Sequence, residues 1–176
     1  MILTEEERVT LSTLDRVLDR ARRSRRVRAI VRRVEAKLAA DPSSVLAWEP
    51  VPLDVYGRKL PAAVRSSWVF VLRARRLTGA ERHPNSIQRM ASLRGVGDLE
   101  TWRDGEWRSN ALVSDPKAPW ERRWVSVPVN VWHQAVVPAD EDWVVLSFHT
   151  AAERELIEER GDPARESRLR RRRYVD

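Results

Sequence analysis

The chain contains no cysteine, which removes disulfide bonds and thiolate metal ligands from consideration. It also lacks any apolar run near the roughly 18–20 residues that a transmembrane helix needs, so we expect no membrane partner. The first residues carry three glutamates and do not place a basic segment before an apolar one, so we expect no signal peptide. Together these absences favour a cytoplasmic protein.

Lysine is nearly absent, with 3 residues in a total of 33 Lys+Arg, and the formal net charge of +7 is unevenly spread. Residues 1–40 hold 11 basic and 6 acidic residues, and residues 161–176 hold 6 and 3. The middle of the chain, 41–160, holds 16 basic against 17 acidic residues. A nucleic-acid-binding domain needs a basic face on its folded part, so we do not expect a nucleic-acid partner, although the basic arms keep that alternative open.

The two ends of the chain differ in residue pattern from its centre. Apolar residues recur at helical spacing over 1–42, and we expect a helical extension there, with a break in the arginine-rich interval 22–28. Its apolar stripe is expected to pack on the outside of a barrel or across a dimer; the alternative is a basic amphipathic helix for a membrane, a nucleic acid or a partner. Residues 43–66 are proline-rich and predict an extended segment that wraps the barrel.

From residue 67 the chain becomes rich in β-branched and aromatic residues. Strands are predicted at 67–74, 89–93, 99–103, 107–112, 123–127, 133–137 and 143–150, with a hairpin turn at Asp104 and Gly105. Short strands at this spacing predict a mainly β domain, a sandwich or barrel, over 67–160. Residues 151–160 predict a short C-terminal helix, and 161–176 a basic, disordered tail.

Two short stretches within this β region carry residues typical of a metal site. In the first, His83 is followed after four residues by Gln88 and after six more by Gly95, with Glu81 two positions before the histidine. The second contains Pro128, Asn130 and His133, listed here in chain order.

These spacings resemble the two motifs of the cupin superfamily, whose fold is the double-stranded β-helix or jelly-roll barrel. The resemblance implies that Glu81 stands where the family has its first histidine, and Gln88 where it has its glutamate. Asn130 replaces the usual glycine, a mild change because asparagine tolerates a left-handed backbone. The resemblance therefore implies a cupin with a variant metal motif, to which the residue patterns at the two ends add an N-terminal helical extension and a short C-terminal helix.

The metal ligands that the resemblance implies are Glu81, His83, Gln88 and His133, for a divalent transition metal such as Fe, Mn, Ni or Zn. Glu81 and His83 are two positions apart, so on a strand they share one face. Two imidazoles with one carboxylate are also the donor set of non-haem iron sites. The alternative is a vestigial site, with Glu81 paired to a neighbouring arginine and Gln88 hydrogen-bonded inside the barrel.

Other residues are candidates for roles around the metal. His149, at the end of the last long strand, is a candidate catalytic base, although a structural histidine is the alternative. The chain has eight tryptophans, which favour either a stacking pocket or a core with a dimer interface. We predict four residues of a substrate pocket: Asn85, Trp102, Trp132 and Arg94.

The sequence thus predicts a metal-dependent cupin that acts on a small molecule inside its barrel. The resemblance favours oxygenase-type chemistry, with isomerase or lyase chemistry as the alternative. A non-catalytic cupin that binds a small molecule or forms a dimer also stays open. In either case we expect a homodimer.

Overall fold

The computed structural model describes residues 3–57 and 59–174, without the side chains of 166–168. Residues 1–2 of the predicted extension and 175–176 of the predicted tail lie outside the described residues. The chain opens with two α-helices, α1 (Glu5–Arg23) and α2 (Arg25–Ala40). The rest is β-structure with two 3-10 turns, η1 (Leu53–Tyr56) and η2 (Trp120–Arg122), which confirms the mainly β prediction.

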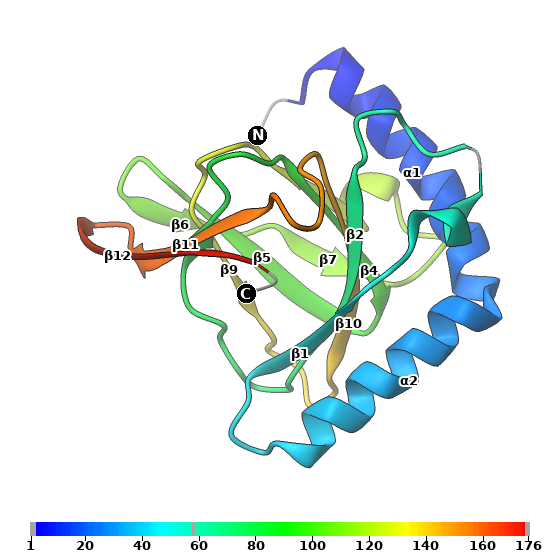
Figure 1. Cartoon of the computed structure of the whole chain (residues 1–176), viewed down its shortest axis with the longest axis horizontal. Coiled ribbons are helices and arrows are strands. Elements are labelled where there is room, and N and C mark those ends of the chain that lie inside the picture. Colours follow the sequence, from blue (N-terminus) through cyan, green and yellow to red (C-terminus); the bar gives the residue numbers. More distant parts are fainter. Residues whose placement is uncertain (1–2, 58, 175–176) are drawn as a thin grey trace.

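The strands form two antiparallel sheets that enclose a barrel (Figure 1). Across the first sheet the order is β1 (Leu46–Pro50), β2 (Ser66–Leu72), β10 (Trp143–His149), β4 (Gln88–Arg94) and β8 (Trp124–Val127). Across the second it is β12 (Arg165–Arg173), β11 (Ile157–Asp162), β3 (Glu81–Arg82), β9 (His133–Val136), β5 (Val96–Arg103) and β6 (Glu106–Arg108), with β7 (Ala111–Val113) also paired to β5. Strands distant in the chain are therefore neighbours in both sheets.

The five-stranded sheet is buried on both faces. In β2, Trp68 and Phe70 point into the barrel core, while Val69 and Val71 point to a second core beneath the helices. Successive side chains of a strand face opposite sides, so a strand covered twice needs apolar residues at every position. This is why β2 has an unbroken apolar run. Each such side chain contributes about 1.5–3 kcal/mol when it leaves water.

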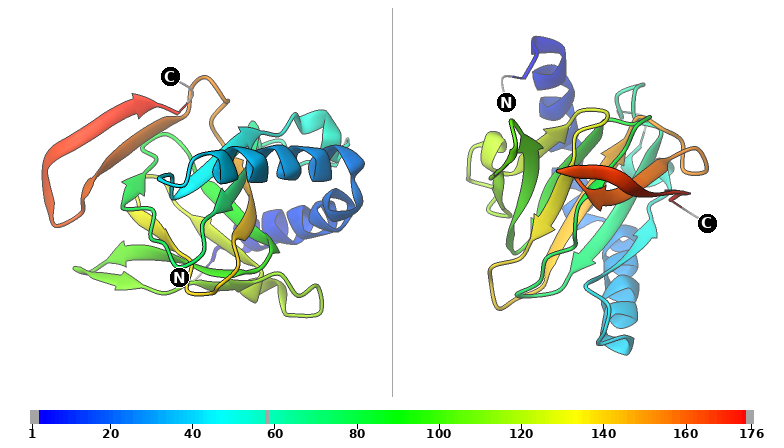
Figure 2. Two further views of the ribbon diagram at one scale, coloured as in Figure 1. Left: turned by 90° about the horizontal axis from the view of Figure 1, so that it is seen from below. Right: turned by 90° about the vertical axis from the view of Figure 1, so that its left-hand side faces the viewer.

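The helices cover the outer face of this sheet (Figures 1 and 2). Thr4 caps α1 by accepting a hydrogen bond from the backbone N–H of Glu7. Ser24 ends α1 and caps α2, which places the break inside the predicted interval. Leu14 and Leu18 lie in the core between helix and sheet, so the expected packing on the outside of the barrel is confirmed.

Two buried ion pairs fasten α1 to the sheet. Glu7 receives bonds from Nε and Nη2 of Arg89 on β4, both at 2.7 Å. Asp15 accepts from Nη2 of Arg123 at 2.8 Å and from the Trp124 indole N–H at 2.8 Å. The arginine side chains are 4% and 8% exposed, so each carboxylate neutralises a charge that water does not reach. Arg89 and Arg123 therefore have a structural role.

The prediction for the C-terminal end was wrong. Residues 151–160 do not form a helix, and the described part of the predicted tail, 161–174, is not disordered: β11 and β12 form a hairpin that projects from the body (Figure 2). Pro163 and Ala164 form its turn, and the Asp162 carboxylate accepts from the Ala164 N–H at 2.9 Å. At the base of the hairpin, directly after β12, Tyr174 is buried. The charged strands of this hairpin lack the apolar alternation by which strands are found in a sequence.

The segment 43–66, expected to be extended, contains β1 as the edge strand of the five-stranded sheet. In the described part of the chain, neither helix is apolar enough over sufficient length to span a membrane. The outer face of the five-stranded sheet is occupied by the chain's own helices, so a homodimer would need another surface and stays a prediction.

Candidate metal centre

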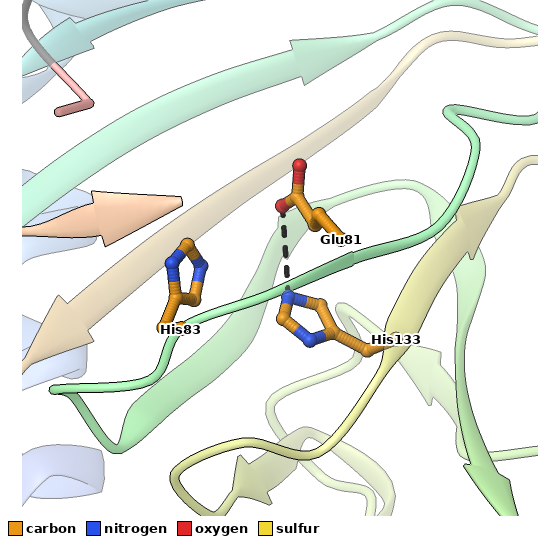
Figure 3. Close-up of side chains that lie close together, drawn as sticks. All are labelled: Glu81, His83 and His133. Carbon is orange, nitrogen blue, oxygen red and sulfur yellow. Dashed lines mark ion pairs between the residues drawn. The ribbon is translucent and has the colours of Figure 1, made fainter. Parts of the chain in front are cut away.

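Glu81, His83 and His133 converge inside the barrel from two paired strands (Figure 3). Glu81 on β3 lies directly opposite His133 on β9, and His83 follows β3 on the same face. One potential ligand atom from each residue lies within 4.8 Å of the others. The Glu81 Oε1 and His133 Nε2 atoms are 3.5 Å apart, and the two imidazole ring centres are 5.3 Å apart.

Backbone carbonyls orient both imidazoles. Nδ1 of His83 lies 3.0 Å from the carbonyl oxygen of Ile157, and Nδ1 of His133 lies 3.0 Å from that of Val131. A carbonyl can only accept, so each Nδ1 must carry the proton and donate it. In a neutral ring Nε2 is then the nitrogen with a free lone pair, so it is the atom that each histidine can offer to a metal.

The Glu81 carboxylate is held in its charged form. Burial alone would raise its pKa, but the two histidines and Arg160 outweigh burial and hold the pKa well below its usual range. Arg160 on β11 donates from Nη2 to Glu81 Oε2 at 2.8 Å, while Oε1 faces His133. Arg160 is in turn fixed through its Nε, which donates to the fully buried Glu158 at 2.8 Å.

His83 favours the neutral form that coordination needs. Burial, assisted by the nearby His133, lowers the pKa of His83 from 6.5 to about 4. Among the described residues, buried Nε2 of His133 makes no hydrogen bond, and its polar neighbour is Oε1 of Glu81 at 3.5 Å. Such an orphaned atom is costly unless something binds it, which fits a cation at this point.

A small cavity of about 30 Å³ borders these residues. Glu81, His133 and Gln88 form its polar end, and apolar side chains such as Phe70 and Met90 form most of its wall. The side-chain oxygen of Gln88 is buried, again without a partner among the described residues. Gln88 therefore lies beside the cluster, as the spacing predicted, with a free oxygen on its amide.

Two residues of the predicted motifs adopt the left-handed backbone that their positions require. Asn130 has φ +61°, and its N–H donates to the carbonyl of His83 at 3.0 Å, which ties the second motif to the first. Gly95 has φ +82°, and a Cβ there would lie 3.2 Å from the carbonyl oxygen of Asp142. Both observations agree with the fold that the motifs imply.

His149, the candidate catalytic base, lies behind the cluster. Its ring is 5.1 Å from that of His83 in an edge-to-face arrangement. Its Nε2 is 2.8 Å from the hydroxyl of Ser147, and its Nδ1 is 3.4 Å from that of Ser86. Burial and the positive charge that His83 can carry lower its pKa well below the usual value. A catalytic role stays a prediction; these contacts favour a neutral histidine that supports the His83 ring.

Asn85 and Trp132 lie close to the cluster but do not line the cavity. The Asn85 side chain donates to the carbonyl of Glu155 at 2.7 Å and accepts from the Ile157 N–H at 3.1 Å. It thereby positions the carbonyl that orients His83. The Trp132 ring lies on the outer side, under the guanidinium of Arg82 at 4.7 Å.

The predicted pocket positions of Arg94 and Trp102 have to be corrected. A β-bulge near Val144 shifts the pairing of β4 and β10, so that Arg94 lies opposite Val144 and shares its outward face. Arg94 then pairs with Glu35 of α2. Trp102 follows the inward-facing Thr101, so strand alternation turns it outward, where its ring packs on Trp107 at 5.3 Å.

The C-terminal hairpin brings to the site residues that were not among the predicted ones. Besides Arg160, these include Tyr174, whose ring lies 5.2 Å from that of Trp68 and 6.0 Å from that of His83. Burial, with the charges of Glu81 and Glu158, raises its pKa well above the usual value. The turn signal at 161–163 could have separated two strands here, but the flanking runs are too charged to suggest buried partners.

The comparisons with known proteins support the fold. No protein-family model and no curated protein sequence matches the chain. Among solved structures, the coconut allergen cocosin is similar with a TM-score of 0.50 and 17% identity, over 67% of this chain and 29% of the cocosin chain. Oxalate oxidase in complex with the substrate analogue glycolate has a TM-score of 0.48 and 8% identity, over 63% of this chain and 54% of the oxidase chain.

Cocosin has the cupin fold, and so does this chain. The matches span about half of the oxidase chain and less than a third of the cocosin chain. At such low identity the likeness concerns the fold alone. What the site can do therefore has to be argued from its own residues.

Proposed function

We propose that this protein is a metal-dependent cupin that binds a divalent transition metal through Glu81, His83 and His133 and acts on a small molecule. The observation that carries the proposal is the convergence of three ligand atoms within 4.8 Å inside the barrel. One of them, His133 Nε2, is buried and makes no hydrogen bond among the described residues, although it lies 3.5 Å from Oε1 of Glu81. A cation at this point would satisfy that atom and offset the charge of Glu81.

The donor set fits a first-row metal. Two neutral imidazoles and one carboxylate leave coordination positions open, which is typical of Fe(II) and also suits Mn, Ni or Zn. The free amide oxygen of Gln88 is a candidate fourth donor. When bound, such a metal supplies Lewis-acid polarisation of a coordinated small molecule or activation of dioxygen.

The surrounding residues support this chemistry by fixing the ligands. The carbonyls of Ile157 and Val131 keep the proton on Nδ1 of each histidine. Arg160 keeps Glu81 ionised and directs its Oε1 towards His133. The apolar wall of the cavity limits the access of bulk water to the reacting molecule.

Metal content of the purified protein tests the proposal. We expect about one metal ion per chain by elemental analysis, and loss of that ion in the double variant His83→Gln/His133→Gln. The matched control is His149→Gln, which changes a third buried histidine of the same barrel and should retain the metal. Circular dichroism and thermal unfolding show whether each variant is folded.

Two results would count against the proposal. One is a folded wild-type protein that binds neither Fe, Mn, Ni nor Zn after dialysis against each. The other is equal metal content in the double variant and the wild type, which would place the metal elsewhere.

Oxygenase-type chemistry is the reaction class we propose first, because the open 2-His-1-carboxylate set is suited to dioxygen activation. Isomerase or lyase chemistry through Lewis-acid polarisation is the alternative. Oxygen consumption by the Fe(II)-loaded protein, measured across a panel of small organic acids and aromatic compounds, separates the two. Turnover without oxygen uptake would favour the alternative.

The size of the cavity favours a second candidate function. About 30 Å³ is far below the roughly 300–1,000 Å³ of typical ligand pockets. Tyr174 also fills space near His83. A non-catalytic cupin, in which the metal or a small ligand stabilises the barrel or a dimer, would have these properties. A metal-loaded protein with raised thermal stability and no turnover across the panel would support it.

A further inference from the structure

A second cavity lies outside the barrel, between the helices and the outer face of β4 and β10. Its volume is about 350 Å³, which is in the range of small-molecule sites. Its floor is apolar and consists of Val27 and Val31 from α2 with Leu93 and Val144 from the sheet. The floor can therefore cover the hydrocarbon part of a ligand. We call this cavity the helix–sheet groove.

The rim of the helix–sheet groove is strongly cationic. Four arginines line it, against the single carboxylate of Glu35. Glu35 already pairs with Arg94. The other three arginines, Arg22, Arg28 and Arg32, give the groove a positive charge that its own lining does not offset.

Arg22 is less exposed to solvent than Arg28 and Arg32. It donates from Nη1 to the carbonyl of Ser114 at 2.7 Å and from Nη2 to that of Ser92 at 3.0 Å. Among the described residues its buried Nε has no partner. Burial and the positive charge of Arg123 lower its pKa, and three aspartates act in the opposite direction: Asp15, Asp19 and Asp115. The guanidinium thus lies in a place where an anion would be stabilised.

The start of α2 adds to this positive potential. Its first turn contains Arg25, Arg26 and Arg28, whereas α1 begins with three glutamates. A helix N-terminus carries a partial positive charge, so arginines there are electrostatically unfavourable without an anion nearby. Arg26 is paired with Asp54, but Arg28 lines the groove.

We propose that the helix–sheet groove binds a small amphiphilic anion, that is, a carboxylate or phosphate monoester on a short apolar body. Guanidinium groups bind both kinds of anion through paired N–H donors. The apolar floor would take the hydrocarbon part, and the rim the charged head. The groove is separate from the metal centre, so this proposal does not depend on the proposed metal function.

Isothermal titration of the full chain with matched probes tests the proposal. Hexyl phosphate and hexanoate carry both parts, hexanol carries only the apolar body, inorganic phosphate carries only the anion, and hexylamine has the opposite charge. We expect saturable binding of hexyl phosphate or hexanoate with a Kd below about 10 mM, and much weaker binding of the other three. Equal binding of inorganic phosphate, or binding of hexanol alone, would overturn the amphiphile assignment.

Charge reversal at the rim tests where the probe binds. The variant Arg28→Glu/Arg32→Glu should weaken hexyl phosphate binding roughly tenfold or more, because two attractive contacts become repulsive. The matched control, Lys37→Glu, reverses a charge on the same helix but outside the groove and beyond its first turn, and should alter the Kd by less than about twofold. Equal effects of the double variant and the control, or no binding at all to the wild type, would contradict the proposal.

The anionic head could come from a soluble metabolite or from a lipid. Vesicles of phosphatidylcholine with and without phosphatidic acid distinguish these sources. Binding of soluble hexyl phosphate that is lost in the rim variant supports the groove as a small-molecule site, whether or not vesicles also bind. Binding to anionic vesicles without any binding of the soluble probes would overturn it in favour of a surface that recognises membranes by charge alone.

Discussion

Arg160 and Glu81 form an ion pair at 2.8 Å that joins the C-terminal hairpin to the proposed metal centre. The pair uses Oε2 of Glu81 and leaves Oε1 facing His133. Arg160 therefore acts as a positioning residue: it contacts a proposed ligand and not the metal itself.

Replacement of Arg160 should weaken metal binding. We expect Arg160→Gln to reduce the affinity of the metal by roughly 10- to 100-fold, since Glu81 loses its orienting partner and ionises less readily. Arg160→Lys should recover part of the loss. Competition with a chelator measures the affinity, and the visible spectrum of a Co(II)-loaded protein reports a change in ligand geometry.

Arg170 offers a matched control for this prediction. It lies opposite Arg160 on β12 and is exposed to solvent. Arg170→Gln removes the same charge from the same hairpin and should leave the metal affinity and the Co(II) spectrum unchanged. Similar losses in both variants would show that the net charge of the hairpin matters, and not the contact with Glu81.

Replacement of Gln88 distinguishes its proposed role as a metal ligand from the cost of burying its amide oxygen. Its amide oxygen is buried without a partner among the described residues. In metal-free protein, Gln88→Leu should therefore be neutral or raise the free energy of unfolding by about 1 kcal/mol, because an unsatisfied group is removed. In the presence of metal the same variant should bind more weakly. An unchanged metal affinity would exclude Gln88 as a donor.

The low pKa of His83 predicts how the stability of the metal-free protein depends on pH. The pKa is lowered from 6.5 to about 4 in the folded state, so below pH 6.5 the unfolded chain binds more protons than the folded one. The contribution of His83 is then complete above pH 6.5 and is lost as the pH falls to about 4, at up to about 1.4 kcal/mol per pH unit. Urea unfolding between pH 7 and 4.5 measures this slope, which should be shallower in His83→Gln.

The ion pair between Glu7 and Arg89 should contribute strongly to the attachment of α1. Arg89 is only 4% exposed, so Glu7→Ala leaves a buried charge without its counter-charge and should cost about 3 kcal/mol or more. The matched control is Glu5→Ala in the same helical turn, where the side chain is exposed and the expected loss is a few tenths of a kcal/mol. Equal midpoints of urea unfolding for the two variants would contradict the role of the pair.

The fold and the three converging residues could be predicted from the sequence because their signals are local. The spacing of Glu81 and His83 places them on one face of the chain, and the turn at Asn130 has the backbone that asparagine tolerates. Pairing of β3 with β9 then brings His133 opposite Glu81. The motif spacing thus carried most of the information about the candidate ligands.

The remaining parts depend on long-range geometry that no local pattern shows. The bulge that turns Arg94 outward arises from the pairing of β4 with β10, about fifty residues further along the chain. The C-terminal hairpin is charged on both strands, and its burial of Glu158 depends on ion pairs with Arg160 and Arg172. The pocket position predicted for Trp102 was wrong for a local reason: strand alternation relative to the inward-facing Thr101 places Trp102 on the outer face.

Anomalous diffraction from crystals grown with Mn, Fe, Ni or Zn tests the central claim most directly. The account predicts a peak inside the barrel, about 2.0–2.3 Å from a carboxylate oxygen of Glu81 and from Nε2 of both His83 and His133. The result that would contradict it is a barrel that shows no such peak with any of the four metals and keeps the direct contact between Glu81 and His133.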